Sequence, residues 1–370
     1  MARRNAVALT VPALAIAAAL SACQAQESAE TISRPADAED QAGASTAASG
    51  APTEERRFRD WIAVCDNGDA CFAFANGFVR VAVEPGPEGR PQVMIGMFPP
   101  GVSADGPMSL AIDGRAFPVE LDAAAGVDDP PVGRVRGDID ALIAAIAQGE
   151  TMTISRGDQT MPVSLSGAAA AFLWIDERQG RLDTPTALIR RSGDRPAGAV
   201  PPPPPLPRVP VAPAVSQAGL PDVPMLPDSL SRDPALLECA ADVGHLDAEF
   251  TRPTVARLGD GVELWGVPCF TGAYNFGSAY WITAEGGRDP RPAQFASATG
   301  EVDNVLVNAG YDPETRTIEA FNKGRGVGDC GVSQTWVWSG RAFVLTAESA
   351  MTECWGVPPD LWPTYWRTAP

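Results

Sequence analysis

The seven cysteines constrain the fold of this chain more than any other feature, because they divide into one and six. Cys23 stands alone behind an apolar N-terminal run. In an oxidising compartment six cysteines form three disulfides, with fifteen possible pairings. We expect neighbour pairing, because none of its bridges then crosses the proline-rich segment described below. The expected pairs are Cys65 with Cys71, Cys239 with Cys269, and Cys330 with Cys354.

The sequence leaves two other roles open for these six cysteines. A structural zinc site would favour spacing of the Cys-x-x-Cys kind, and a redox-catalytic site would favour it too. The chain contains no such spacing. We therefore predict no metal ligand and no cofactor.

The N-terminus has the features of an export signal. Arg3 and Arg4 supply positive charge, and residues 7–20 are almost wholly apolar. This run is too short for a transmembrane helix and reads as the hydrophobic region of a signal peptide. The order Leu-Ser-Ala-Cys that ends at Cys23 resembles a bacterial lipobox. We predict that residues 1–22 are removed and that Cys23 carries lipid.

Lipid on Cys23 would anchor the protein to a membrane, because each buried methylene contributes about 0.8 kcal/mol. Gln24, where an Asp would favour the inner membrane, points to the periplasmic face of the outer membrane. The alternative is a cleaved soluble protein in which Cys23 is incidental. A formal charge of −18 argues against nucleic acid and anionic lipid as direct partners, since both attract clusters of Lys and Arg.

Composition divides the rest of the chain. Residues 23–55 contain almost no large apolar side chains, which predicts a disordered tether. Residues 196–228 contain a run of prolines and predict a stiff linker, with a ligand for a proline-recognising domain as the alternative. Two folded units of ordinary domain length are left, residues 56–195 and residues 229–370.

The first unit is predicted to be β-rich with two short helices. Apolar residues within 138–146 have helical spacing, with Asp138 as the N-cap and Gly149 beyond the end. Ser166 is the expected cap of a second helix over 168–177. The runs that favour strands are 58–65, 71–76, 78–84, 92–98, 108–112, 116–121, and the hairpin of 151–155 with 161–165.

The second unit shows less helix signal. Its predicted strands are 262–269, 280–283, 293–298, 304–307, 315–321, 334–338 and 342–348. Period-two alternation places Trp336 and Trp338 on one strand face. The predicted fold class is therefore mainly β, with two β-sandwich-like or β-sheet domains joined by a proline-rich linker.

Six strings, from the one at 60–71 to the one at 362–367, together with the six cysteines, resemble a single family over residues 56–370. It is the family of bacterial envelope proteins with the domain of unknown function numbered 1176. The resemblance implies architecture and no activity. Residues 60–65 and the order of elements up to Ser164–Gly167 also resemble the exported, β-sandwich-like invasion-associated locus B proteins. The strings that carry the main resemblance lie at 60–71, 174–181, 184–188, 272–275, 323–331 and 362–367.

No motif for catalysis is present. The single histidine, His245, has no partner in a recognisable motif, and the chain has no nucleophile elbow, phosphate loop or His-Glu-x-x-His. We predict no catalytic residue. Cationic and aromatic side chains within 323–338 suggest a face for a sugar, peptide or carboxylate. The predicted ligand face is Lys323, Arg325, Asp329, Trp336 and Trp338; the alternative is a tight turn beside core aromatics.

The sequence favours a lipid-anchored envelope protein that acts as a binding or structural module, with an envelope protein or a glycan as its partner. We do not expect an enzyme. A periplasmic glycan hydrolase that uses paired carboxylates is the second interpretation. An inhibitor of host lysozyme is the third.

Overall fold

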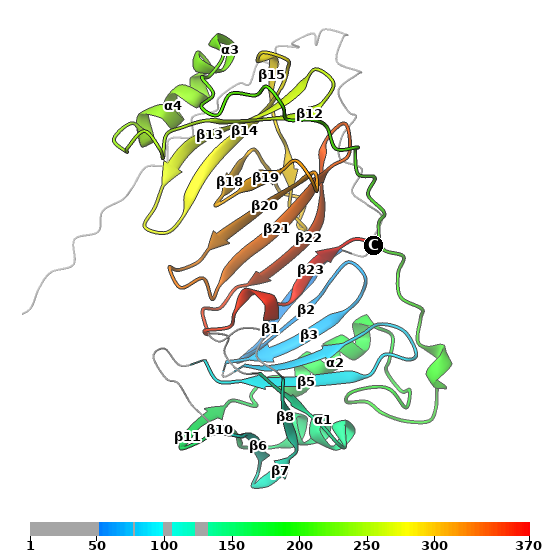
Figure 1. Cartoon of the computed structure of the whole chain (residues 1–370). Coiled ribbons are helices and arrows are strands. Elements are labelled where there is room, and N and C mark those ends of the chain that lie inside the picture. The colour runs from blue at the N-terminus through cyan, green and yellow to red at the C-terminus, as the bar shows by residue number, and fades with distance from the viewer. Residues whose placement is uncertain (1–51, 77, 99–105, 123–131) are drawn as a thin grey trace, which may run out of the picture. The chain divides into compact units, whose positions relative to one another are not determined.

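A computed structural model describes residues 52–76, 78–98, 106–122 and 132–370. The predicted signal peptide, Cys23 and all but the last four residues of the predicted tether lie outside these ranges. The described chain is mostly antiparallel β-sheet with a few short helices, as predicted (Figure 1).

The first sheet has seven strands in the order β1-β2-β3-β4-β5-β9-β8. The run predicted as one strand over 58–65 is instead a hairpin, because Arg59 and Asp60 form the turn between β1 and β2. The strands are β1 (Glu54–Phe58), β2 (Trp61–Cys65), β3 (Cys71–Ala75), β4 (Val79–Val83), β5 (Pro91–Gly96), β8 (Val119–Leu121) and β9 (Val132–Val135).

A four-stranded sheet and two helices lie against one face of the first sheet. The strand order of this four-stranded sheet is β11-β10-β6-β7. The elements are β6 (Met108–Ile112), β7 (Arg115–Phe117), β10 (Met152–Arg156), β11 (Gln159–Val163), α1 (Ile139–Gln148) and α2 (Ala168–Arg178). Buried side chains of both sheets and both helices, including Trp61, Ile95, Leu142, Ile154 and Phe172, form one hydrophobic core.

One predicted helix cap is confirmed and one is wrong. The Asp138 carboxylate caps α1 by accepting a hydrogen bond from the amide of Ala141 at 2.9 Å. Helix α2 starts after Gly167 without a side-chain cap, so Ser166 does not cap it. Gly167 has φ +104°, and a Cβ there would lie 1.7 Å from the carbonyl oxygen of Phe58. Close backbone packing therefore fixes this start.

The later part of the chain contains two five-stranded sheets and one two-stranded sheet. The first holds β12 (Thr254–Gly259), β13 (Val262–Thr271), β14 (Phe276–Ala284) and β15 (Arg288–Pro292) in that order, with β18 (Val305–Val307) paired to β14. The second has the order β19 (Gly310–Asp312), β20 (Thr317–Lys323), β21 (Gly331–Trp338), β22 (Phe343–Met351) and β23 (Thr364–Arg367). The small sheet pairs β16 (Phe295–Ala296) with β17 (Val302–Asp303).

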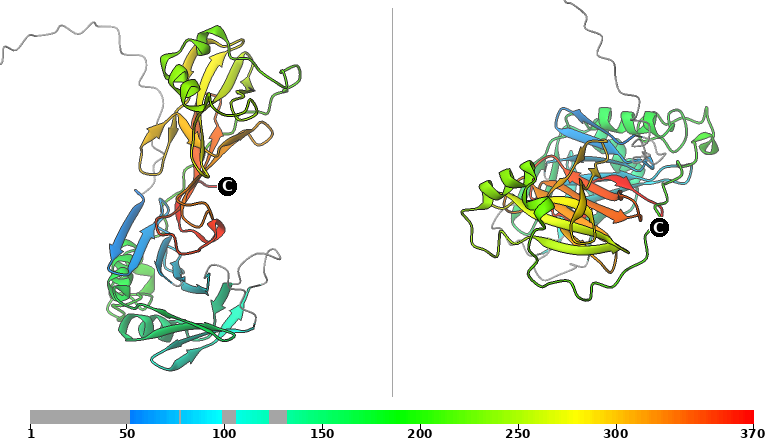
Figure 2. Two further views of the ribbon diagram at one scale, coloured as in Figure 1. Left: turned by 90° about the vertical axis from the view of Figure 1, so that its left-hand side faces the viewer. Right: turned by 90° about the horizontal axis from the view of Figure 1, so that it is seen from above.

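Two helices that the sequence analysis did not predict cover the β13–β14 sheet. They are α3 (Asp228–Ser231) and α4 (Pro234–Val243), seen beside the yellow strands in Figure 2. The carboxylate of Asp233 caps α4. Leu236 and Cys239 pack against Trp265 and Trp281 in a separate core cluster.

All three disulfides join the predicted neighbours: Cys65 to Cys71, Cys239 to Cys269, and Cys330 to Cys354. The first joins β2 to β3 inside the first sheet. The second ties α4 to β13. The third joins the loop before β21 to the loop after β22.

The proline-rich segment is mostly exposed, and hydrogen bonds at three points tie it to the rest of the chain. The carbonyl oxygen of Pro207 accepts a hydrogen bond from the amide of Ala369 at 2.8 Å. The amide of Ala212 donates to the carbonyl of Trp338 at 2.9 Å. The side chain of Gln217 bonds to the backbone of Arg257 through both its donor and its acceptor. These contacts hold the segment against the β-sheets, and the predicted domain boundaries stay a prediction.

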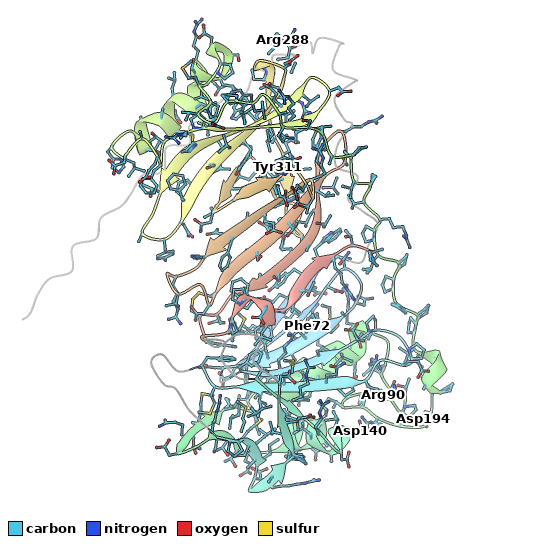
Figure 3. All side chains as sticks on the ribbon, in the orientation of Figure 1. Phe72, Arg90, Asp140, Asp194, Arg288 and Tyr311 are labelled. Atoms are coloured by element: carbon cyan, nitrogen blue, oxygen red, sulfur yellow. A yellow bond between two sulfur atoms is a disulfide. The ribbon has the colours of Figure 1, made fainter. Side chains whose placement is uncertain are left out.

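The second face of the first sheet is also buried, which explains why all ten residues of β2 and β3 are inaccessible. Side chains that point away from the helices include Ile62, Val64 and Phe72, the last of which is labelled in Figure 3. They share a hydrophobic cluster with residues close to the C-terminus, among them Met351 and Trp362. The continuous apolar sequences of β2 and β3 therefore reflect packing against both faces of the sheet.

Polar contacts support this second packing surface. The side-chain amide of Asn67 makes two 2.9 Å hydrogen bonds to the backbone of Arg367, whose guanidinium lies 2.5 Å from the buried carboxylate of Asp66. The guanidinium of Arg80 donates to the carbonyl of Leu361 at 3.2 Å. Burial lowers the pKa of Arg80 to about 10.

Candidate functional site

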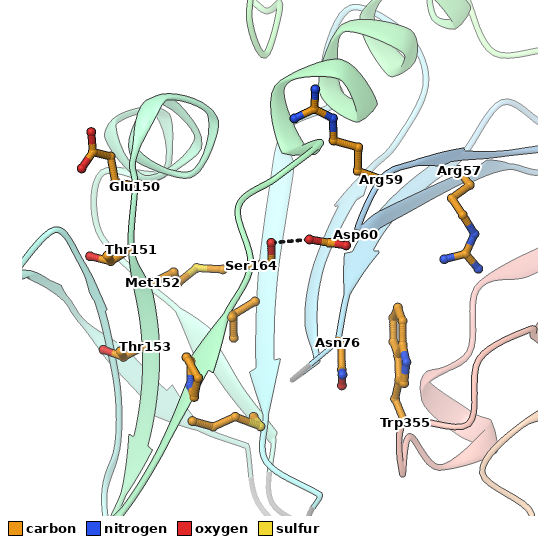
Figure 4. Close-up of a pocket in the computed structure, with 13 residues that line it drawn as sticks. Arg57, Arg59, Asp60, Asn76, Glu150, Thr151, Met152, Thr153, Ser164 and Trp355 are labelled. Carbon is orange, nitrogen blue, oxygen red and sulfur yellow. Dashed lines mark hydrogen bonds between the residues drawn. The ribbon is translucent and has the colours of Figure 1, made fainter. Parts of the chain in front are cut away.

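The candidate site is a pocket of about 720 Å³ beside the edge of the first sheet (Figure 4). One wall comes from the turn between β1 and β2, and another from strands β10 and β11. The loop after β22 supplies an aromatic side chain. The polar and aromatic residues that line the pocket are Arg57, Arg59, Asp60, Asn76, Glu150, Thr151, Thr153, Ser164 and Trp355.

The first two walls are fixed to each other by hydrogen bonds. The hydroxyl of Ser164 donates to the Asp60 carboxylate at 2.6 Å, a contact drawn in Figure 4. The indole of Trp61 donates to the carbonyl of Ser164 at 2.9 Å, and the amide of Asp60 donates to the carbonyl of Ser166 at 3.2 Å. The hairpin turn and the end of β11 therefore form one rigid border of the pocket.

The third wall is the Trp355 loop, defined here as residues 352–357. The indole ring of Trp355 packs edge-to-face on Phe74, with ring centroids 6.0 Å apart. Next to it, Glu353 pairs with the guanidinium of Arg57. Figure 4 shows the indole beside Arg57 and Asn76. Trp355 is half-buried, and its ring lines the pocket.

The structure separates the five residues of the predicted ligand face. Trp336 and Trp338 are only 1% and 3% exposed and pack in the core beside Phe295 and Phe343. Both rings are therefore core side chains in this structure, which is the alternative that the sequence left open. Alternation along β21 indicated correctly that the two tryptophans share a face of the strand. It did not indicate that this face is the one that packs against the core.

The charged members of that predicted face lie together in a loop. The guanidinium of Arg325 makes two hydrogen bonds to the Asp329 carboxylate, at 2.6 and 2.5 Å. This pairing holds the pKa of Asp329 below its ordinary value and the pKa of Arg325 above its own. The ammonium of Lys323 lies 5.6 Å from the ring of Phe321. None of the three lines the pocket.

A cluster of polar residues between α2 and Thr184 is buried and stabilises the fold. Arg181 is inaccessible and donates to three backbone carbonyls, those of Glu84, Gly86 and Gly89, and to the side chain of Gln179. Burial lowers the pKa of this guanidinium, and attraction to Asp176 opposes that change. The group holds the loop after β4 against the end of α2.

Asp176 also stabilises the fold, by binding backbone amides. Its two carboxylate oxygens accept hydrogen bonds from the amides of Leu188 and Ile189, at 2.7 and 2.9 Å. Burial raises the pKa of this carboxyl, and the two amide donors oppose the rise. His245 is exposed and does not line the pocket.

No group of three or more His, Cys, Asp and Glu side chains within the described residues is arranged to hold a metal ion. Among the helices of the described ranges, none has the length and apolar character needed to cross a membrane.

Comparison with known proteins places the chain among relatives without an assigned activity. A protein of Escherichia coli strain K12, named "Uncharacterized protein YpfG", is 32% identical over 351 residues, which cover 85% of this chain and 93% of that protein. The crystal structure of invasion associated protein b from Bartonella henselae matches 34% of this chain and 99% of its own, at 16% identity and a TM-score of 0.28. A TM-score this low carries no argument about fold or function.

The family model described as "Protein of unknown function (DUF1176)" matches residues 55–369, the same region in which the sequence strings pointed to that family. The resemblance is thereby confirmed, and this chain belongs to the DUF1176 family.

Proposed function

We propose that this protein is a lipid-anchored envelope protein that binds a glycan in the pocket beside Trp355. The observation that carries the proposal is the composition of the pocket. One indole ring stands opposite a border of hydroxyl, amide and carboxylate groups, in a volume of about 720 Å³. Small-molecule sites usually have volumes of about 300–1,000 Å³.

The chemistry of a sugar ring fits such a border. Its C–H face packs on an aromatic ring, and its hydroxyls donate to and accept from planar polar groups. Thr151, Thr153 and Ser164 offer hydroxyls, and Asn76 offers an amide. Arg57 is already paired with Glu353, and Arg59 shares the lining with the carboxylates of Asp60 and Glu150, so the pocket does not depend on a negatively charged ligand. A neutral saccharide is therefore the favoured class.

The location is inferred from the sequence and is compatible with the disulfides. Three disulfides are typical of an exported protein, and the lipobox-like order at Cys23 supports lipid attachment. Replacement Cys23→Ser should remove the acyl chains and shift the protein from the membrane to the soluble fraction. Mass spectrometry of the N-terminus and fractionation measure both effects; an unchanged membrane fraction would contradict the anchor.

A hydrolase is the second candidate, because Asp60 and Glu150 both line the pocket. Binding is favoured over hydrolysis because Asp60 accepts a hydrogen bond from Ser164, and because the carboxyls whose pKa burial raises, Asp66 and Asp176, are bound to backbone amides outside the pocket. Release of reducing ends from a glycan would support the hydrolase instead.

The binding test uses the full exported chain in detergent and chitotetraose, a neutral N-acetylhexosamine oligosaccharide, in titration calorimetry. Trp355→Ala should weaken binding about tenfold, since an aromatic contact contributes about 0.5–1.5 kcal/mol beyond its buried area. Trp366→Ala is the matched control, because this half-buried tryptophan lies outside the pocket. Equal affinities of wild type and Trp355→Ala would reject the site.

A further inference from the structure

The position of Trp355 depends on a second loop, defined here as the 323–331 loop, which itself does not line the pocket. We propose that the 323–331 loop is a positioning element for Trp355, with Asp329 as its central residue, and that it sets glycan affinity without touching the glycan. This inference rests on the proposed function. It gives a role to Arg325 and Asp329 different from the direct ligand contact predicted from the sequence.

The Asp329 carboxylate joins the two loops. Besides its two hydrogen bonds from Arg325, it accepts one from the amide of Gly356 at 2.6 Å. The Arg325 guanidinium also reaches the other loop, where it donates to the carbonyl of Cys354 at 3.1 Å. Asp329 is 5% exposed, so water competes little for these contacts. The residues on both sides of Trp355 are therefore held by one ion pair.

The disulfide fixes the same place covalently. Cys354 precedes Trp355 and is bonded to Cys330, the residue after Asp329. On the other side of Trp355, Gly356 has φ +80°, and a Cβ there would lie 2.6 Å from the carbonyl oxygen of Phe98. The Trp355 loop forms no helix or strand, so these contacts replace the hydrogen bonds that regular structure would supply.

The 323–331 loop is itself anchored to the tip of the β13–β14 hairpin. The side chain of Asn275 accepts from the amide of Lys323 at 3.2 Å and donates to its carbonyl at 2.9 Å. The hydroxyl of Tyr274 donates to the carbonyl of Gly324 at 3.1 Å. Two of the strings that mark the family, 272–275 and 323–331, are thus in direct contact. The chain of contacts runs from the hairpin through Asp329 to Trp355.

The test compares Asp329→Asn with Asp312→Asn, a matched change in an exposed turn that does not line the pocket. The full exported chain is labelled with 5-fluorotryptophan, and the Trp355 resonance is assigned by its loss in Trp355→Phe. We expect Asp329→Asn to shift or broaden that ¹⁹F resonance and to weaken chitotetraose binding at least fivefold, while Asp312→Asn changes neither. Asp329→Glu should restore part of both, since it keeps the charge.

The outcomes separate the two proposals. If the Trp355 resonance is unchanged in Asp329→Asn, Asp329 does not position the indole, and this conclusion holds at any chitotetraose affinity. A moved resonance with unchanged affinity would overturn its effect on binding. If Trp355→Ala binds chitotetraose as wild type does, the proposed function fails, and the ¹⁹F shift still decides whether Asp329 positions the indole. In the double variant Asp329→Asn with Trp355→Ala, affinity should fall no further than in Trp355→Ala alone.

Discussion

Two arginine-containing segments of this chain use similar side chains for different purposes. In the first, Arg181 is completely buried and donates to three backbone carbonyls of one loop and to the side chain of Gln179. In the 323–331 loop, Arg325 is half-exposed and pairs with Asp329 beside a pocket wall. Both segments belong to strings that mark the family. Such a string can therefore stabilise the fold or position a residue of the site, and the burial of its arginine and the partners of its guanidinium distinguish the two cases.

The largest expected effect is on the buried segment. Arg181→Ala should lower the free energy of unfolding by about 3–5 kcal/mol, because three buried carbonyls and Asp176 lose their cation. Urea denaturation followed by tryptophan fluorescence measures this. Arg190→Ala, which removes an exposed arginine paired with Asp183, should cost less than about 1 kcal/mol. If both variants lower the free energy of unfolding by similar amounts, the buried contacts of Arg181 do not have the stabilising role assigned to them.

The two long disulfides offer a second contrast. They close loops of similar length, with separations of 24 and 30 residues, so each pair of Cys→Ala changes should cost about 2–4 kcal/mol. Only the loss of Cys330–Cys354 should also weaken chitotetraose binding, because only that bridge holds the Trp355 loop. Calorimetry at a temperature where both variants are folded checks this. Equal losses of affinity would show that binding follows general stability.

The smallest effect is on pH dependence. The paired guanidinium lowers the pKa of Asp329 from 3.8. A carboxyl with a lowered pKa in the folded state contributes stability above its unfolded pKa and loses it as the pH falls through the folded value. The part of the chitotetraose affinity that depends on the Asp329 carboxylate should therefore be kept from neutral pH down to 3.8 and be lost only below it. Asp329→Asn should show weak affinity throughout, without this decline; an identical decline would assign the titration to another group.

The sequence predicted most strands, because their apolar runs end at turn residues. It did not predict the hairpin of β1 and β2, although Arg59 and Asp60 interrupt the run at its turn. Helix α4 was missed although Asp233 and Pro234 are a typical helix start. The neighbour pairing of cysteines was predictable because it is local. Local patterns were therefore sufficient for most strands and for the disulfides, but not for this hairpin or for α4.

The site was not predictable in the same way. Arg57, Ser164 and Trp355 are far apart in the sequence, and only tertiary packing brings them to one pocket. The apolar runs of β2 and β3 indicated buried strands but not that the C-terminal residues cover their second face. Arg325 and Asp329 were recognised as polar residues of interest, and their partner Gly356 carries no side chain to recognise.

The central claim is that the indole of Trp355 is the surface on which the ligand packs. Titration of the 5-fluorotryptophan-labelled protein with chitotetraose tests it most directly, because the chain has nine tryptophans that report separately. The Trp355 resonance should move with saturation, while the resonances of the buried Trp336 and Trp338 should stay in place. Movement of another resonance without Trp355, or of none, would contradict it.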